Sequence, residues 1–211
     1  MKKTFVILLL TLFASTAFNA LAQVTARWGV TVGGVYNELH FKQTDIFASD
    51  RRFGPSGGLT GELMIHGVGF GFDASLLYTM RSARLHMGDR VAWSSQGIGT
   101  TNLNMHFIDV PIHLRFKYRR LGGVEDKIAP IIFAGPQFSF LVGHTKIGSP
   151  DQIVYKTTNV QLHFGIGAEL FNHLQICAGY GFNVGETCRT RVLDENAAKN
   201  RTWTLTATYL F

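Results

Sequence analysis

The stretch VGFGFDASLLYTM (residues 68–80) consists of two interleaved sequences. Every second residue, from Val68 to Met80, is apolar, and the residues between them are mostly small or polar, with Asp73 in the middle. A period of two is typical of a β-strand whose two faces meet different surroundings. The alternation leaves open which solvent each face meets, because soluble and membrane barrels both alternate in this way.

The first residues, 1–22, have the organisation of a secretory signal peptide. Two lysines precede the apolar h-region FVILLLTLF (residues 5–13), and the small-residue sequence ALA ends at Ala22. This pattern predicts cleavage between Ala22 and Gln23. The apolar run is too short to cross a bilayer as a helix, which disfavours a membrane anchor. We therefore expect an exported mature chain, residues 23–211, that forms one domain.

Composition narrows the class of protein. Charged residues make up 16% of the chain, whereas about a quarter is usual. The formal net charge of +6 includes Lys2 and Lys3, which leaves +4 (6 − 2) for the mature chain. This modest charge, without a run of lysines and arginines, predicts no binding to nucleic acid. If the protein were soluble, so low a content of charged residues would need an explanation, because the surface of a soluble protein is normally rich in charge.

The alternation of residues 68–80 recurs along the whole mature chain. We expect eight strands, at residues 27–39, 58–66, 68–80, 107–118, 130–143, 160–170, 174–184 and 202–211. An even number of strands is usual in a closed antiparallel membrane barrel.

The connections between these strands alternate in length. Long polar stretches are expected after every second strand, at 41–57, 81–104, 143–159 and 185–201. The turns around Gly67 and Asn172 are very short. Outer-membrane barrels combine long extracellular loops with short periplasmic turns. The sequence therefore predicts an all-β fold, an eight-stranded antiparallel transmembrane β-barrel with long extracellular loops, short periplasmic turns and both termini in the periplasm.

The polar face of the strands fits the inside of such a barrel better than it fits a soluble exterior. It is dominated by Gly, Ser, Thr and Gln, and the lumen of an eight-stranded barrel is only wide enough for side chains to fill it. Buried charges need partners, so we expect the few ionisable side chains on this face to form a hydrogen-bonded network, to which Arg27 also contributes. Its expected members are Glu62, Asp73, Asp109, His113, Arg115, Lys117, His163 and Glu169.

The apolar face is then the exterior, in contact with outer-membrane lipid. Aromatic residues gather near the strand ends on this face, as in the interfacial girdles of membrane barrels. The expected girdle consists of Trp28, Tyr36, Tyr78, Tyr118, Trp203 and Phe211.

Two prolines and two cysteines raise separate questions. Pro111 and Pro136 lie within expected strands, where a closed barrel offers no free edge, so we expect a β-bulge at each. Cys177 lies in a strand and Cys188 in the loop beyond it. If the strand runs straight between them, their Cα atoms are too far apart to bridge, which favours two free thiols but leaves a disulfide open.

With these strands in place, the chain resembles a known family. The sequences FIDVPIHLRFKY, APIIFAGPQFSFLVG, NVQLHFGIGAEL, HLQICAGYGFNVGE and TYLF are similar to those of PorT-type outer-membrane β-barrel proteins. The resemblance covers most of the mature chain and is strongest over residues 107–211. It implies an eight-stranded barrel and transfers no catalytic residue. It also implies that the terminal Phe211 belongs to a signal read by the barrel-assembly machinery.

The leading functional hypothesis is an integral outer-membrane protein without catalysis, with a structural or surface-interaction role carried by its loops. No catalytic residue, cofactor or metal site is expected. His66, His113 and His163 belong to different strands without the spacing of metal ligands, so hydrogen bonding inside the barrel is their expected role.

The expected loops are mildly basic. The second long loop contains Arg81, Arg84, His86 and Arg90. These side chains could contact lipopolysaccharide phosphates or envelope proteins, although solvated loop charges are the commoner interpretation.

Three alternatives remain. The namesake of the PorT-type family takes part in protein export across the outer membrane, so an accessory role in export is the first. The second is a lipid-modifying enzyme, which would need a nucleophile beside a base; His86, Ser94, Ser95 and His144 lie in loops, but no spacing connects them. The third, a channel for small solutes, is the weakest, because an open aqueous pore takes about twice as many strands.

Overall fold

The computed structural model describes residues 24–41, 48–65, 68–86, 99–118, 127–147, 153–190 and 197–211. The expected signal peptide and its cleavage site at Ala22 and Gln23 lie outside these residues. The strands are β1 (Val24–Phe41), β2 (Ala48–Ile65), β3 (Phe70–His86), β4 (Thr100–Lys117), β5 (Ile128–His144), β6 (Ile153–Tyr155), β7 (Thr158–Leu170), β8 (Leu174–Asn183), β9 (Cys188–Thr190) and β10 (Ala197–Leu210). In this described part of the chain no helix has the length and apolar character needed to cross a membrane.

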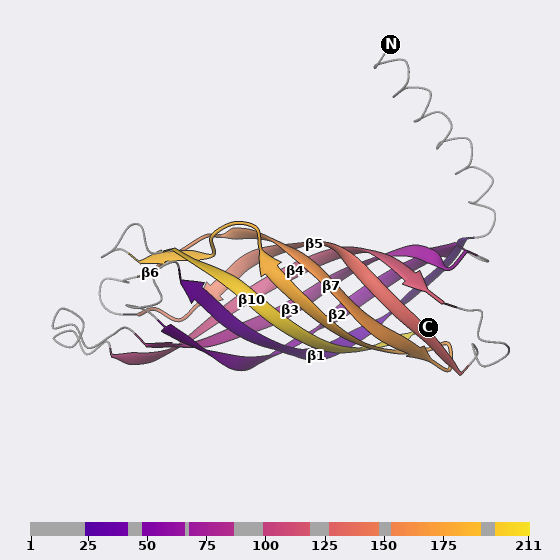
Figure 1. Cartoon of the computed structure of the whole chain (residues 1–211), viewed down its shortest axis with the longest axis horizontal. Coiled ribbons are helices and arrows are strands. Elements are labelled where there is room, and N and C mark those ends of the chain that lie inside the picture. Colours follow the sequence, from indigo (N-terminus) through magenta and orange to yellow (C-terminus); the bar gives the residue numbers. More distant parts are fainter. Residues whose placement is uncertain are drawn as a thin grey trace, which may run out of the picture.

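Eight of the strands close into an antiparallel barrel (Figure 1). The order is β1-β2-β3-β4-β5-β7-β8-β10, and β10 pairs with β1 to complete the circle. The two three-residue strands, β6 and β9, pair with each other, and β9 also pairs with β10 beyond the end of β8. The structure confirms the eight-stranded antiparallel barrel that the alternation predicts.

The register of the pairs fixes the dimensions of the barrel. A path through directly paired residues leaves β1 at Ala26 and, after one circuit, returns to β1 at Tyr36. It passes Leu63, Phe72, Leu114, Ala134, Phe164, Tyr180 and Trp203. An offset of about ten residues over eight strands corresponds to a strand tilt of about 40° and a wall radius of about 8 Å. Side chains fill a lumen of this width.

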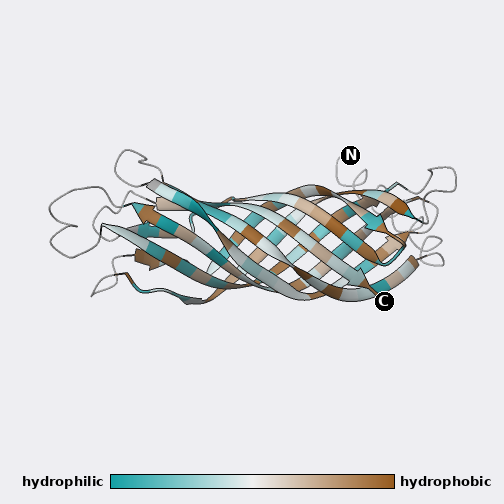
Figure 2. Ribbon diagram, turned by 90° about the horizontal axis from the view of Figure 1, so that it is seen from below, coloured by the Kyte–Doolittle hydropathy of each residue, from teal (hydrophilic) through white to brown (hydrophobic). Residues whose placement is uncertain are grey.

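The barrel has two different ends. We call the end that contains Val24 and Leu210 the terminal rim, and the end that contains Phe41, His86 and Thr100 the distal rim. From the terminal rim to beyond the middle of the barrel, large apolar side chains are exposed on the outside and polar ones are buried inside. Figure 2 shows the resulting alternation of hydrophobic and hydrophilic residues along the strands.

Toward the distal rim the polarity of the two faces reverses. On β1, Leu39 and Phe41 are buried inside the barrel, while Glu38 and His40 lie on the outer face. On β4, Leu103 is fully buried, and its neighbours along the strand are asparagines. A strand segment with an apolar inside and a polar outside has the pattern of a water-soluble barrel. The distal part of the molecule therefore has a hydrophobic core of its own.

This reversal explains why the expected loops are too long. Much of each expected loop is strand, because its polar residues are outward-facing strand residues of the distal part. Strands β2 and β4 begin well inside the expected loops, at Ala48 and Thr100, and β3 runs on to His86. The connections that remain at this rim are 42–47, 87–99, 145–157 and 184–196, and the last two contain β6 and β9.

The β-bulges expected at Pro111 and Pro136 are not found. Next to each proline the ladder between β4 and a neighbouring strand opens for two residues and resumes in the same register. The missing N–H is thus accommodated by a gap in the pairing. The register shifts lie elsewhere, between Arg51 and Ser56 on β2 and between His106 and Phe107 on β4.

Candidate functional site

Near the terminal rim, ionic side chains cross the lumen and form what we call the terminal cluster. It consists of Arg27, Glu62, Arg115, Lys117, Glu169 and Gln175. The Arg27 guanidinium lies 2.7 Å from both Glu62 and Glu169, and the Lys117 ammonium is hydrogen-bonded to the same two carboxylates. Five strands on different sides of the barrel supply these groups, so the cluster ties the wall together across its interior.

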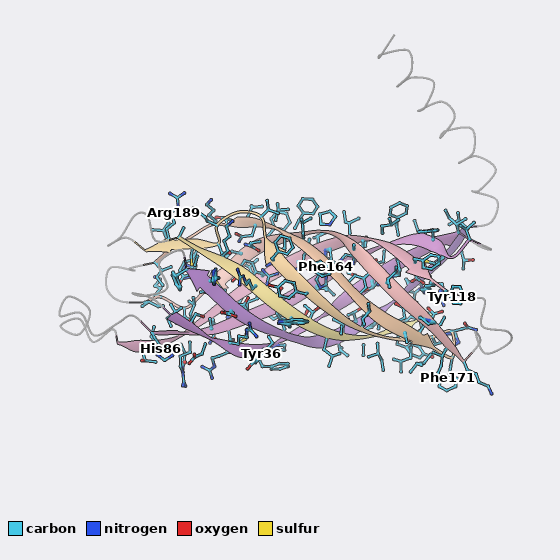
Figure 3. All side chains as sticks on the ribbon, viewed as in Figure 1. Tyr36, His86, Tyr118, Phe164, Phe171 and Arg189 are labelled. Carbon is cyan, nitrogen blue, oxygen red and sulfur yellow. The ribbon has the colours of Figure 1, made fainter. Side chains whose placement is uncertain are left out.

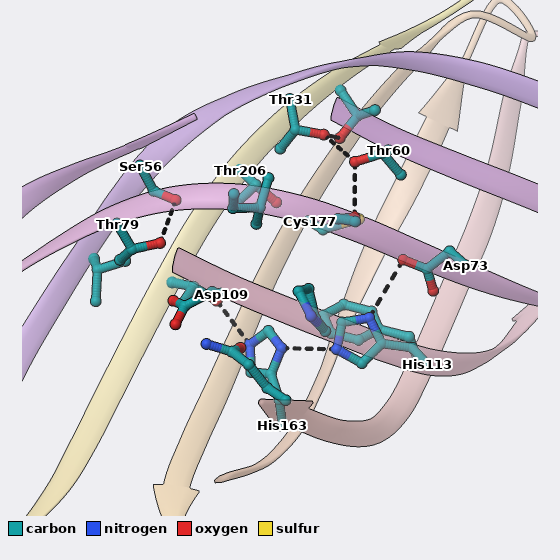
Figure 4. Close-up of a pocket in the computed structure, with 18 of the residues that line it drawn as sticks. Thr31, Ser56, Thr60, Asp73, Thr79, Asp109, His113, His163, Cys177 and Thr206 are labelled. Carbon is teal, nitrogen blue, oxygen red and sulfur yellow. Dashed lines mark hydrogen bonds and ion pairs between the residues drawn. The ribbon is translucent and has the colours of Figure 1, made fainter. Parts of the chain in front are cut away.

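A hydrogen-bonded chain leads from this cluster toward the middle of the lumen (Figure 4). Arg115 Nη2 lies 3.0 Å from Asp73 Oδ2, and the same carboxylate oxygen lies 3.3 Å from His113 Nδ1. His113 Nε2 lies 3.0 Å from His163 Nδ1, and His163 Nε2 lies 3.0 Å from the Thr204 hydroxyl. The two rings thus extend the network across the barrel.

The charges of this interior network balance. Three cations, Arg27, Arg115 and Lys117, face three carboxylates, Glu62, Asp73 and Glu169. Each buried ion carries a desolvation cost of several kcal/mol that partners must offset. The matching numbers make that compensation feasible.

A second, smaller ionic group lies closer to the distal rim. Arg81 Nη2 lies 2.7 Å from Asp109 and 3.0 Å from the Ser139 hydroxyl, and its guanidinium lies 4.5 Å from the centre of the Phe107 ring. The expectation that Arg81 lies in a loop is wrong. It is a fully buried strand residue on the same face as Asp73 and Thr79, because these positions differ by even numbers.

An internal cavity of about 60 Å³ lies between the two ionic groups. Asp73, Arg81, Asp109 and Arg115 contribute to its lining, together with a row of threonines that includes Thr31 and Thr60 (Figure 4). A cavity of this volume has room for a few water molecules. In the described part of the chain several polar atoms of these charged residues have no protein partner, which water would satisfy.

Apolar side chains close the lumen on the distal side. This apolar cap consists of Leu39, Phe41, Ala83, Leu85, Leu103, Met105, Phe107, Ile147, Ile153, Cys188 and Ala198. It includes residues from the connections around β6 and β9, two strands that extend the wall beside β10 at this end. The cavity and the Arg81–Asp109 pair therefore lie between the terminal cluster and the apolar cap.

All eight residues expected in the interior network are buried, but they do not form one group. Asp109 contacts Arg81, whereas the other seven join the terminal cluster and the histidine chain. Sequence reasoning missed Gln175, Arg81 and the apolar cap. Arg81 lies an even number of residues from Asp73, and this spacing could have shown that its side chain faces the lumen. The apolar cap follows from the reversal of polarity between the two faces, which a search for constant alternation does not detect.

The expected girdle residues all lie on the outside of the barrel, in two groups. Tyr118 lies near the terminal rim (Figure 3), as do Trp28 and Phe211, whose rings are 4.6 Å apart. Tyr36 and Trp203 form a cross-strand pair farther along the wall, and Tyr78 is exposed on β3. Trp28 and Tyr36 are separated by about 20 Å along the barrel axis, given the tilt and the rise per residue.

At the distal rim, His86 is a strand residue with two polar neighbours. Its Nε2 lies 2.7 Å from Asp50 Oδ2, and its Nδ1 lies 3.3 Å from the Thr100 hydroxyl. The histidine and aspartate side chains are 40% and 64% exposed. His144 stacks on Tyr155, and Arg84, also a strand residue, binds Asn102. Ser94, Ser95 and Arg90 lie outside the described residues.

No group of three potential metal ligands occurs among the described residues, so the cysteines and histidines in this part of the chain form no metal centre. His66 lies outside them. Cys177 and Cys188 are both free and buried, as their spacing favours. Burial raises the pKa of the Cys188 thiol to about 12, so this group is a neutral member of the apolar cap.

A comparison with protein families agrees with this geometry. A family model described as "Outer membrane protein beta-barrel domain" matches residues 21–188. No curated protein matches the chain.

Similar solved structures include several small barrels. The outer membrane enzyme PagL has 14% identity and a TM-score of 0.47, over 88% of this chain and 99% of PagL. Ail, the attachment invasion locus protein of Yersinia pestis, has 12% identity and a TM-score of 0.41, over 88% and 99%. OprG from Pseudomonas aeruginosa has 11% identity and a TM-score of 0.44, over 89% and 95%. At these identities the likeness concerns the fold.

Proposed function

The chain belongs to the outer membrane protein beta-barrel domain family and is an integral outer-membrane protein, and from this premise we propose that it acts without catalysis, through a surface that its distal rim presents outside the cell. The single observation that carries the proposal is the closed lumen. Ionic side chains fill one end and the apolar cap fills the other, with only a small cavity between them. Such an interior supports a structural or surface-interaction role better than transport.

Two measurements test this proposal. Purified protein in a planar bilayer should give no large, stable conductance steps, and such steps would contradict the closed lumen. Single cysteines introduced by Thr100→Cys or Phe171→Cys, with Cys177 and Cys188 replaced by alanine, report orientation. On intact cells a membrane-impermeant maleimide should label position 100 at the distal rim and not position 171 at the terminal rim. The reverse pattern would overturn the proposed orientation.

The resemblance of FIDVPIHLRFKY and the following strands to PorT-type proteins supports a finer assignment. We place the chain in that branch of the family as part of the proposal, and an accessory role in protein export would follow from it. A deletion strain with fewer secreted or surface proteins would support the export role, and an unchanged secretome would contradict it.

A second candidate function rests on His86. An imidazole between the Asp50 carboxylate and the Thr100 hydroxyl has the connectivity of a general base beside a nucleophile. The exposure of this group argues against it, because water competes for every hydrogen bond. Release of fatty acid from outer-membrane lipid by the wild type, lost in both His86→Ala and Thr100→Ala, would establish hydrolysis. No release by the wild type would end this candidate.

A further inference from the structure

Aromatic side chains form a continuous row on the outer wall beyond its middle. Tyr180, Trp203, Tyr36 and Phe53 are directly paired across β8, β10, β1 and β2. The Tyr180 and Trp203 rings lie 4.9 Å apart. Tyrosine and tryptophan prefer the boundary between hydrocarbon and headgroups, because one end of each ring system is apolar and the other can be hydrated. On β10, β1 and β2 this row therefore marks the distal limit of the lipid-facing wall, whereas beyond Tyr180 the apolar Phe182 and Val184 are still exposed.

Positive side chains follow immediately on the distal side of the row on β10 and β2, the two strands that flank β1. Arg201 lies two residues beyond Trp203 on β10, with Lys199 two residues farther. Arg51 on β2 is bonded to Glu38 on β1, two residues beyond Tyr36, at 2.6 Å. Two residues of a tilted strand rise about 5 Å, which is the step from the hydrocarbon boundary to the headgroups. We call Arg51, Lys199 and Arg201 the basic wall.

The cations of the basic wall are poorly neutralised by the protein. The described residues give the basic wall one ion pair, in which Glu38 Oε2 accepts from Arg51, and Glu38 is also the residue paired with Arg201 across β1 and β10. Arg201 has no ion-pair partner in the described part of the chain, and Lys199 approaches only the Val184 carbonyl oxygen, at 3.5 Å. On β3, the neighbour of β2, Arg84 is bonded to Asn102. The basic wall thus has donors available to an anion.

We propose that the basic wall and the aromatic row together bind the phosphorylated headgroup of an outer-leaflet glycolipid, as lipid A is. The inference rests on the proposed orientation, which puts the distal rim outside the cell. Arg201 and Lys199 donate to the phosphate, and guanidinium groups suit phosphate oxygens because they can donate two parallel hydrogen bonds. The Tyr36 and Trp203 rings pack against the sugar, and the acyl chains lie along the apolar wall below, over exposed Val32 and Leu205.

The test compares lipids that differ only in phosphate. Folded protein in detergent is titrated with lipid A and with dephosphorylated lipid A, and bound lipid is counted by native mass spectrometry. The wild type should bind lipid A at least roughly tenfold more tightly, as charge-assisted hydrogen bonds predict. The double variant Arg201→Ser/Lys199→Ser should lose this preference. The matched control Arg84→Ser/Lys156→Ser removes two positive charges from the same rim and should keep it. Retarded migration of boiled against unboiled samples on a gel verifies that each barrel is folded.

Three results would overturn the inference. The Arg201→Ser/Lys199→Ser variant could keep the preference for lipid A. The control variant could lose as much of this preference as that variant does, and this result would indicate a general attraction of anions to the rim. Inorganic phosphate at millimolar concentration could displace lipid A completely, which would indicate a soluble anion as the ligand. Lipid selectivity in detergent does not depend on orientation in the cell, so a failed labelling pattern at position 100 would refute the proposed function separately.

Discussion

Glu62 has four hydrogen-bond partners in the terminal cluster. It accepts from Arg27, Arg115, Lys117 and Gln175, and it is 1% exposed. Removal of one member of a balanced set of buried ions leaves an uncompensated charge, which is costly because water cannot replace the partner.

We therefore expect Glu62→Gln to lower the free energy of unfolding by about 3–5 kcal/mol. The control is Glu38→Gln, which removes one partner of the exposed pair with Arg51 and should cost at most about 1 kcal/mol. Urea unfolding of the two variants in the same lipid provides the comparison. Equal losses would mean that the terminal cluster contributes little to stability.

The Cys188 thiol should be unreactive in the folded protein. Its raised pKa of about 12 means that the neutral thiol persists until the pH approaches that value, and at pH 8 only about one molecule in ten thousand carries the nucleophilic thiolate. In a Cys177→Ala background we expect negligible maleimide labelling at pH 8 and full labelling after denaturation. Rapid labelling of the folded barrel would show that the apolar cap opens.

At the scale of elements, the seam between β1 and β10 is the pairing that closes the barrel. Gly29 lies in this seam opposite Leu210, and a Cβ at this position would meet the Tyr209 carbonyl group. Backbone atoms of a neighbouring strand cannot move aside as a flexible side chain can.

Gly29→Ala should thus destabilise the barrel by about 1–3 kcal/mol, the usual cost of overpacking. Gly61→Ala, in the pairing of β2 with β3, is the matched control. The atom nearest to a Cβ at this position lies 3.9 Å away, which is an ordinary contact distance. The fraction of protein that migrates as a folded barrel on a gel, measured against urea concentration, compares the two. A tolerant Gly29 would mean that the seam adjusts freely.

Alternation along the strands, together with the small and weakly charged residues of the polar face, was enough to predict which face of each strand is buried, as β3 illustrates. Asp73 lies inside the barrel and Phe72 outside it, because neighbouring residues of a strand point to opposite faces and the closed wall encloses only one of those faces. The ends of β3 could not be predicted in this way. Between Thr79 and Leu85 the inner residues change from polar to apolar, so the amphipathic pattern changes sign while the strand continues.

The prolines illustrate a second limit. Sequence alone shows that Pro111 lacks a donor, but it does not show whether the neighbouring strand responds with an extra residue or with a gap. Here β3 and β4 resume the same register beyond the gap, because a shift by one residue would turn Asp109 and His113 out of the lumen.

At the scale of the whole molecule, the reversal of polarity predicts how far the barrel projects from the membrane. Val32 and His40 lie on the same outer face of β1, eight residues apart, but on opposite sides of Tyr36. A nitroxide label at Val32→Cys should collide mainly with oxygen, which concentrates in hydrocarbon, and one at His40→Cys mainly with a water-soluble nickel chelate. Similar collision profiles at both positions would mean that the distal part does not emerge into water.

The pairing of β1 with β10 also has a temporal consequence. Of the strands in the barrel, β1 leaves the ribosome first, and one of its two neighbours, β10, leaves last. No nascent polypeptide that lacks β10 can complete the cylinder, so the chain must be kept unfolded until β10 has been made, and sequence-distant contacts of this kind form slowly. A premature stop anywhere before residue 197 would therefore yield an open sheet with two unsatisfied edges, a substrate for proteases and not a shorter version of the protein.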